Sequence, residues 1–177
     1  LVGIVGRLDP MKDHRTFLQA ASKVMSKRKD VLFICVGDGN IKYLEDLQQY
    51  SEGLGLSENI RWQPGQSDIE NAYNALDVLV STSAFGEGFS NTLAEAISCG
   101  VRCVATDVGD ARSVLLDSCV VVPAGDSSAV ASGILEILDS DDHENSKFKK
   151  TANDHVRNNY SIDRLVSNTL KVFNSRL

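Results

Sequence analysis

Short apolar runs alternate with helical patterns along almost the whole chain, and this alternation constrains the fold more than any other feature. Apolar runs of strand length occupy residues 1–5, 31–36, 59–63, 77–83, 101–105 and 119–122. Helical spacing of apolar residues marks the segments between and after them, at residues 13–27, 41–52, 68–75, 91–99, 110–116 and 127–138. Strands that are apolar on both sides are typical of a parallel sheet with helices on both faces. The sequence therefore predicts one α/β domain with a Rossmann-like parallel sheet of about six strands.

Two cations follow the first predicted strand, in a loop where ligands of such a sheet bind. Gly6 frees the backbone there, and Arg7 and Lys12 place two positive charges at the edge of the sheet. Arginine offers a planar fork and lysine a compact charge, so the pair suits a diphosphate, although two solvated surface cations are the alternative. The spacing of Gly3 and Gly6 does not fit GxGxxG, and the chain has no GxxxxGK[ST] sequence. Dinucleotide and P-loop sites are therefore disfavoured.

Glycines also follow the second and fourth predicted strands. Gly37 and Gly39 allow a tight turn beside a ligand, although an ordinary turn explains them too. Gly86 and Gly88 lie just before a helix that opens near Ser90. The free N–H groups at the start of a helix, together with its positive dipole end, bind phosphate well. The loop after the fourth strand is therefore the strongest candidate for an anion site.

Two glutamates belong to the same stretch. Glu87 precedes the helix and could reach a sugar at the phosphate end of a ligand. Glu95 lies in the second turn, where a carboxylate can accept hydrogen bonds from the two vicinal hydroxyls of a ribose. A capped helix with two ordinary glutamates is the alternative.

Composition excludes several classes of partner. The 177 residues suit a single domain, and a net charge of -6 with a pI near 5.0 argues against a general nucleic-acid partner. A small anionic ligand is still allowed, because phosphate sites are local. No apolar run approaches the ~18 residues of a membrane span. The four cysteines form no CxxC pair and are predicted to be reduced core thiols, in a protein of the cytoplasm: Cys35, Cys99, Cys103 and Cys119.

The glutamates carry a resemblance to a known family. They are separated by seven residues in EGFSNTLAEAISCG, which precedes a strand and TDVGDA. This pattern resembles the E-x7-E signature of the retaining GT-B glycosyltransferases of family 4, also called group 1. The opening GRLDPMKDHRTFLQA is similar to the donor-phosphate motif of that family, and GDG to another donor-side loop. The resemblance identifies residues 1–177 as the nucleotide-sugar-binding domain, the C-terminal half of a GT-B fold, without its N-terminal acceptor domain.

The resemblance implies a role for each matching residue. Arg7 and Lys12 would hold the diphosphate and stabilise charge on the leaving group, while Glu87 would contact the donor sugar. Glu95 would bind the ribose. The other donor-binding positions implied are Gly6, Gly37, Gly39, Gly88, Phe89, Ser90, Asn91 and Thr92.

The implied reaction is the transfer of a hexose from a donor such as a UDP- or GDP-sugar to a glycan, a lipid-linked sugar or a small molecule, with retention of configuration. The nucleotide base would lie against the loops after the second and third strands, near Gln63 and Pro64. The family implies no metal ion or other cofactor, and the two cations and the helix start could stabilise a leaving diphosphate without one.

Two other functions stay open: a GT-B nucleotide-sugar epimerase and a non-catalytic nucleotide-sugar-binding module. The opening motif and the E-x7-E spacing favour transfer, and the intact charged residues of the site argue against a degenerate copy. The isolated chain is expected to bind donor but to transfer little, because the acceptor half is missing. The full-length protein is expected in the cytoplasm, with peripheral contact to the inner face of the membrane.

Some features are interpreted as structural. Arg102 stands where the family usually has a proline, and we expect it to point to solvent. The DSDD sequence at residues 139–142 looks like the DxD metal motif of GT-A glycosyltransferases, but it follows a helical pattern and indicates a solvated helix end. Residues 147–177 are polar and helical in pattern, with Ser161 as a cap between two segments that suit the family's last helix. The three histidines all have polar sequence neighbours: His14, His143 and His155.

Overall fold

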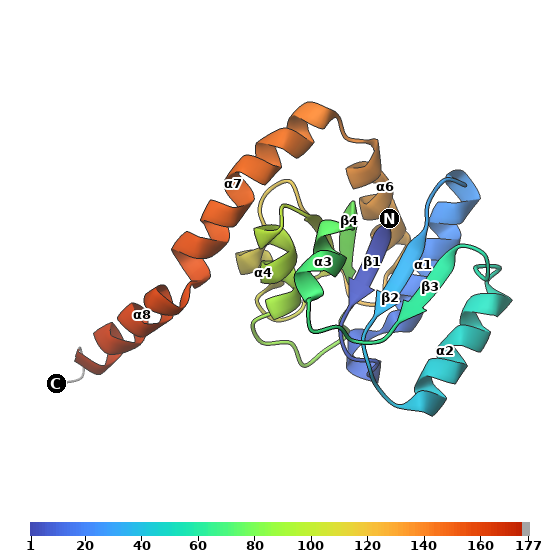
Figure 1. Cartoon of the computed structure of the whole chain (residues 1–177), viewed down its shortest axis with the longest axis horizontal. Helices are drawn as coiled ribbons and strands as arrows, with labels where there is room; N and C mark the ends of the chain where they lie inside the picture. The colour runs from blue at the N-terminus through green and yellow to red at the C-terminus, as the bar shows by residue number, and fades with distance from the viewer. Residues whose placement is uncertain (175–177) are drawn as a thin grey trace.

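A six-stranded parallel sheet with the order β3-β2-β1-β4-β5-β6 forms the centre of the molecule (Figure 1). The computed structural model describes residues 1–174, apart from the side chain of Asp142. The strands are β1 Val2–Val5, β2 Phe33–Val36, β3 Ile60–Gln63, β4 Val78–Ser81, β5 Arg102–Thr106 and β6 Val120–Val122. Val2 pairs with Phe33 of β2 on one side and with Val78 of β4 on the other. The predicted Rossmann-like sheet is confirmed, with β1 and β4 at its centre.

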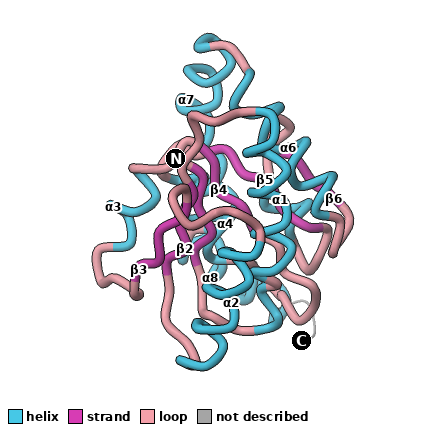
Figure 2. The backbone as a smooth tube through the Cα atoms, turned by 90° about the vertical axis from the view of Figure 1, so that its right-hand side faces the viewer, coloured by secondary structure: helices cyan, strands magenta, loops and turns pink. Residues whose placement is uncertain are grey.

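Helices cover both faces of the sheet, and in Figure 2 the strands lie between them. One face carries α1 His14–Lys27, α2 Ile41–Gly53 and α6 Ser127–Asp139. The other carries α3 Ile69–Asn74, α4 Asn91–Ser98, α5 Ala111–Val114 and α7 Asp142–Tyr160. Each face has its own apolar cluster, the first around Phe17 and Ile134 and the second around Ile97 and Phe148.

The first loop is held between a buried strand and a capped helix. All four residues of β1 are buried, as expected for a strand covered on both faces. A short 3-10 helix, Pro10–Lys12, follows, and then Asp13 caps α1 by accepting a hydrogen bond from the backbone N–H of Thr16 at 3.2 Å. The chain therefore turns sharply after Lys12, which keeps the loop at the carboxyl edge of the sheet.

The two C-terminal helices differ in how they contact the domain. α7 packs on α4 through the buried side chains of Phe148 and Ala152, whereas α8, Ile162–Asn174, has no buried residue and points away from the sheet (Figure 1). Ser161 separates the two helices, and its Oγ accepts a hydrogen bond from the backbone N–H of Arg164 at 3.3 Å, which confirms the predicted cap. Residues 175–177 of the predicted segment lie outside the described residues. Over residues 1–174, none of the helices combines the length and apolar character needed to cross a membrane.

Arg102 corrects the expectation of a solvent-facing side chain. It is the first residue of β5 and is buried, with its guanidinium at the end of α6. Its Nη2 donates to the carbonyl oxygen of Ile137 at 2.8 Å and also contacts Ser140 Oγ, and its Nη1 lies 3.8 Å from a carboxylate oxygen of Glu144. The last carbonyl groups of a helix lack hydrogen-bond donors within the helix. Arg102 therefore supplies donors to the carbonyl end of α6.

The DSDD segment forms a junction between two helices. Asp139 ends α6 and pairs with Arg28 at 2.8 Å. Asp141 caps α7 by accepting the backbone N–H of Glu144 at 2.8 Å. The segment follows a helix and not a strand, as predicted, and the carboxylates of Asp139 and Asp141 have structural partners.

Candidate functional site

The loops after β1 and β4 meet at the carboxyl edge of the sheet. The chain leaves β1 for α1 on one face and leaves β4 for α4 on the other, so the two loops border the point where the strand order reverses. Two interactions fix them together: Ala84 donates its backbone N–H to the carbonyl of Met11 at 2.8 Å, and the buried hydroxyl of Thr82 reaches the carbonyls of Lys12 and Asp13 at 2.9 and 3.0 Å. Residues that are about 70 positions apart in sequence therefore form one rigid unit.

Lys12 and Glu87 form an ion pair at the centre of this unit. Ser83, which is fully buried, donates its hydroxyl to the same Glu87 oxygen at 2.6 Å. Burial opposes ionisation of Glu87, but the hydrogen bonds from Lys12 and Ser83 and the charges of Lys12 and Arg7 outweigh it and hold the pKa of Glu87 below its usual range. The site therefore presents an ionised carboxylate beside a cation.

Arg7 is exposed at the same edge, where its charge acts on Glu87. The loop that carries it runs beside the loop after β2: Leu8 donates its backbone N–H to the carbonyl of Asp38 at 2.9 Å. At Gly37, whose φ is 152°, a Cβ would lie only 1.9 Å from the carbonyl oxygen of Gly6, so a side chain there would separate the loops. Sequence had placed Gly6, Gly37 and Gly39 in donor-side loops, and the structure brings these loops into contact, with Gly39 bridged to Leu8.

The start of α4 offers backbone donors. Ser90 occupies the N-cap position and is buried, but its side chain makes no capping hydrogen bond. Phe89 and Asn91 on either side are exposed, and the position of a Cβ on Gly88 is open space. An anion could therefore approach the first N–H groups of α4 without displacing a side-chain cap.

The loop after β5 supports this glycine-rich segment from behind. Gly109, with φ 60°, lies so close that a Cβ would be 2.5 Å from the carbonyl oxygens of both Glu87 and Gly88. Asp110 donates its backbone N–H to the carbonyl of Gly88 at 3.1 Å. Thr106, at the end of β5, donates its hydroxyl to the carbonyl of Ser83 at 2.7 Å. The loops after β1, β4 and β5 together thus fix the position of Glu87.

Glu95 lies apart from the cations, on the exposed side of α4. The hydroxyl of the buried Tyr73 donates to Glu95 Oε2 at 2.7 Å, and burial and this carboxylate raise the pKa of Tyr73 far above its usual range. Both residues line a groove of about 420 Å³ that Phe89 and Tyr160 continue, with their ring centroids 5.1 Å apart. Among residues 1–174, the Glu95 carboxylate is therefore held by the Tyr73 hydroxyl and keeps acceptor positions for a diol.

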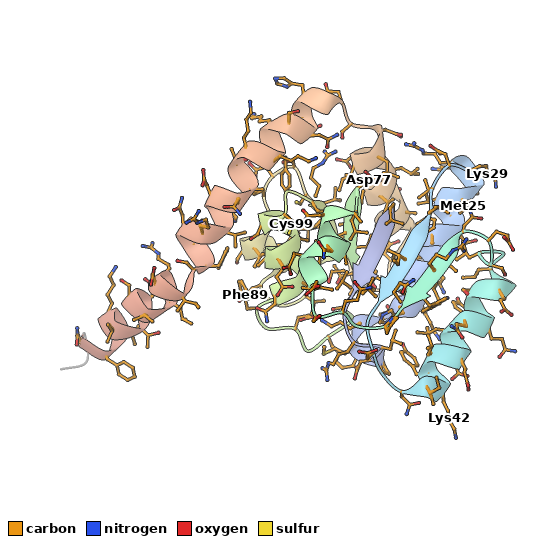
Figure 3. All side chains as sticks on the ribbon, in the orientation of Figure 1. Met25, Lys29, Lys42, Asp77, Phe89 and Cys99 are labelled. Carbon is orange, nitrogen blue, oxygen red and sulfur yellow. The ribbon has the colours of Figure 1, made fainter. Side chains whose placement is uncertain are left out.

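Cavity volume alone does not identify the functional site. A larger cavity of about 660 Å³ borders Asp77 and Arg102, at the amino ends of β4 and β5. Figure 3 shows Phe89 and Cys99 at opposite ends of α4, with Asp77 toward the Cys99 end. That cavity therefore lies at the edge of the sheet opposite the charged loops, where a parallel sheet does not usually bind its ligands.

Sequence reasoning missed the residues that hold the charged groups. Thr82 and Ser83 directly follow β4 and have buried hydroxyls, and Tyr73 lies on a short helix far from Glu95 in sequence. Two hydroxyl residues at the carboxyl end of an apolar run are a sequence signal that could have identified Thr82 and Ser83. Gln63, expected near the nucleotide base, accepts the backbone N–H of Gly37 at 3.0 Å and so lies beside the second loop.

His14 also differs from its sequence-based interpretation. It has polar neighbours in sequence, yet it is buried at the start of α1 with its ring edge-on to Tyr43 at 6.4 Å. Its Nδ1 forms no hydrogen bond with any part of the chain that the structure describes. Burial lowers the pKa of His14 to about 4, with a smaller contribution from the charge of Lys12, against the raising effect of Asp13. A neutral imidazole therefore lies under the loop that carries Lys12.

Comparison with known proteins places the chain in a family. Residues 1–140 match the family described as Glycosyl transferases group 1. Among the curated relatives, the phosphatidyl-myo-inositol mannosyltransferase of Mycobacterium leprae is 36% identical over 143 residues, which cover 77% of this chain and 37% of that protein. This chain therefore spans well under half the length of that relative.

Solved structures agree with the fold. HepE of Anabaena, solved in complex with UDP, has a TM-score of 0.87 at 23% identity, covering 98% of this chain and 48% of that one. The C-terminal domain of the group 1 glycosyl transferase LpcC of Francisella tularensis has a TM-score of 0.77 at 27% identity, covering 91% of this chain and 86% of that one. With a family match over most of its length, this chain belongs to the group 1 glycosyl transferases.

Proposed function

We propose that this chain is the donor-binding half of a retaining glycosyltransferase that uses a nucleotide-diphospho-hexose. The observation that carries the proposal is the Lys12–Glu87 pair, with Arg7 beside it and the uncapped start of α4 in the same loop system. Two cations and free helix N–H groups suit a diphosphate. The mannosyltransferase name of the Mycobacterium leprae relative and the structures of HepE with UDP and with UDP-glucose support a nucleotide-sugar ligand.

The proposed roles follow from charge. When the bond between the anomeric carbon and the diphosphate oxygen breaks, negative charge grows on the diphosphate. Arg7, Lys12 and the N–H groups of α4 stabilise that charge from fixed positions, without a metal ion or other cofactor. Ionised Glu87 accepts hydrogen bonds from the hexose, and Glu95 accepts them from the ribose.

The acceptor belongs to the other half of the proposed protein. The chain covers 37% of the Mycobacterium leprae relative and 48% of HepE, so an acceptor domain in the remainder is the natural counterpart. The isolated chain then binds donor but transfers no hexose. The acceptor is a glycan, a lipid-linked sugar or a small molecule, and the full-length protein works in the cytoplasm with peripheral contact to the membrane.

The test uses the full-length protein with UDP-glucose and GDP-mannose in the presence of a chelator, with methanol as the acceptor. The methyl glycoside that forms does not mutarotate, so NMR reads its anomeric configuration. We expect slow formation of the methyl glycoside with the anomeric configuration of the donor, and a decrease of about 10²–10³-fold in Glu87→Gln. Glu136→Gln, which changes an exposed glutamate of α6, is the matched control and should keep the wild-type rate.

Three outcomes would count against the proposal. A methyl glycoside of inverted configuration would contradict retention, and a requirement for added magnesium would contradict metal independence. Appearance of an epimerised nucleotide sugar would favour a GT-B epimerase instead.

A further inference from the structure

Two cysteines face each other across the last two strands of the sheet. Val104 of β5 pairs with Val120 of β6, and Cys103 and Cys119 each stand one residue before that pair. The backbone N–H of Cys103 donates to Cys119 Sγ at 3.4 Å, while the Cys103 thiol donates to the carbonyl of Val101 at 3.5 Å. Both side chains belong to the apolar cluster on the α4 face of the sheet. Neighbouring strands lie about 4.7–4.9 Å apart, so adjacent positions bring Cα atoms within the range that a disulfide needs.

The environments of the two thiols differ. Cys103 is completely buried, and burial raises its pKa well above the usual range. Cys119 is half-buried, at the bend that leads into β6. Interaction with Cys103, helped by its backbone N–H and by the charge of Arg102, outweighs burial and lowers the pKa of the Cys119 thiol. Cys119 is therefore the more accessible sulfur and the easier of the two to ionise, and Cys103 is the buried thiol behind it.

We propose that Cys103 and Cys119 form a reversible oxidation site that closes to an intramolecular disulfide with a low-molecular-weight disulfide such as oxidised glutathione. The Cys119 thiolate attacks one sulfur of the oxidant, forms a mixed disulfide and expels one glutathione thiolate. That thiolate accepts the proton of Cys103, whose sulfur attacks Cys119 Sγ and expels the second glutathione. Two protein thiols are oxidised and one disulfide is reduced to two thiols, so atoms and electrons balance.

The other two cysteines do not share this arrangement. Cys35 belongs to the apolar cluster on the opposite face of the sheet, and burial raises the pKa of its thiol far above the usual range. Cys99 follows α4, and burial together with Glu70 and Glu95 raises the pKa of its thiol. Oxidation should therefore select one pair out of four cysteines.

A disulfide between Cys103 and Cys119 would close a loop of residues 104–118. This segment contains Gly109 and Asp110, which support the Glu87–Gly88 backbone of the candidate site. The disulfide would thus fasten the edge strand β6 and the base of a supporting loop without using any donor-binding residue. Stabilisation of the folded chain is the expected consequence, because the unfolded chain loses freedom.

The experiment incubates the folded chain in graded mixtures of reduced and oxidised glutathione, alkylates the remaining thiols after unfolding, and maps tryptic peptides by mass. Each cysteine falls in its own peptide, with cleavage at the flanking Lys and Arg: residues 30–42, 62–102, 103–112 and 113–147. We expect peptides 103–112 and 113–147 to appear as one cross-linked species that is two hydrogen atoms lighter than their sum. Dithiothreitol should restore both peptides.

Variants separate the proposed pair from general oxidation. Cys119→Ser should abolish the cross-link, Cys103→Ser should leave a glutathione adduct on Cys119, and the matched control Cys99→Ser should cross-link as the wild type does. The oxidised wild type should melt on the order of 5–10 °C higher than the reduced form, whereas the melting of Cys119→Ser should not respond to the redox mixture. Two results would overturn the proposal: no cross-link at the most oxidising mixture while the chain stays folded, or cross-links to Cys99 or Cys35 as abundant as the proposed one.

Discussion

At the scale of single residues, the charge of Glu87 depends on its two partners. Lys12 and Ser83 both bind one oxygen of this carboxylate and keep its pKa low despite burial. A diphosphate entering the site would compete for Lys12, because a phosphate oxygen accepts the same ammonium protons. Ser83 would then be the partner that still holds Glu87 in place.

Ser83→Ala tests this positioning role. Loss of the hydroxyl should raise the pKa of Glu87 and loosen its carboxylate, which in our account contacts the hexose and not the diphosphate. We therefore expect calorimetric titration to show affinity for UDP-glucose decreased about 10-fold, with affinity for UDP nearly unchanged. Ser128→Ala, which removes an exposed hydroxyl that binds Lys23, is the control. Equal decreases for both ligands would indicate a general structural defect.

His14 should make stability depend on pH. Its pKa is about 4 in the folded chain and 6.5 in the unfolded chain, so the unfolded state binds the proton more tightly. The free energy of unfolding should decrease as pH falls from 6.5 toward 4, by about 3 kcal/mol from this residue. Urea unfolding at several pH values should show a flatter profile for His14→Phe than for the wild type or for His143→Gln, which changes an exposed histidine. Parallel profiles would contradict the assignment.

At the scale of elements, Arg102 connects β5 with the end of α6 and the start of α7. Arg102→Ala should remove donors from the Ile137 carbonyl and Ser140, and cost about 2–4 kcal/mol in the free energy of unfolding by urea. Arg112→Ala breaks an exposed pair with Asp107 that solvent screens, and should leave the free energy of unfolding nearly unchanged. Similar costs for both variants would mean that Arg102 has no special role at this junction.

Most elements could be predicted from the sequence because their signals are local. The apolar runs identify all six strands, although β4 is shorter than the run at residues 77–83, since Thr82 and Ser83 already bind neighbouring loops. α7 begins at Asp142, earlier than the predicted residue 147, because its first turn carries few apolar residues that would indicate a helix.

The candidate site is predictable only in part. The charged residues and glycines of the site can be recognised from sequence motifs. The structure brings Arg7, Lys12 and Glu87 into one charged group. The groups that hold them come from distant segments: Tyr73 reaches Glu95 from α3, and Gly109 supports Glu87 from the loop after β5. Burial of Arg102 and His14 likewise depends on which helices pack against them, and sequence spacing does not contain that information.

At the scale of the whole molecule, α8 extends from the domain with an exposed apolar face. Ile162, Leu165, Leu170 and Phe173 are all exposed, although their spacing is that of a helix face buried against a partner. We expect the isolated chain to self-associate in sedimentation velocity at high concentration. Leu165→Glu combined with Phe173→Glu should give a monomer at every concentration, whereas Glu136→Gln should behave as the wild type. A monomeric wild type would contradict this prediction.

The central claim is that the carboxyl edge of β1 and β4 binds a nucleoside diphosphate. The most direct test is the melting temperature of the isolated chain with UDP, GDP, ADP and TDP, without magnesium, beside Arg7→Ala and Glu95→Ala. A ligand at about 100 times its dissociation constant adds roughly 2.7 kcal/mol, which is a shift of about 5–10 °C for a domain of this size. We predict such a shift with one diphosphate for the wild type and none for either variant. If no diphosphate shifts the wild type, or if both variants respond as it does, the proposed donor site is contradicted.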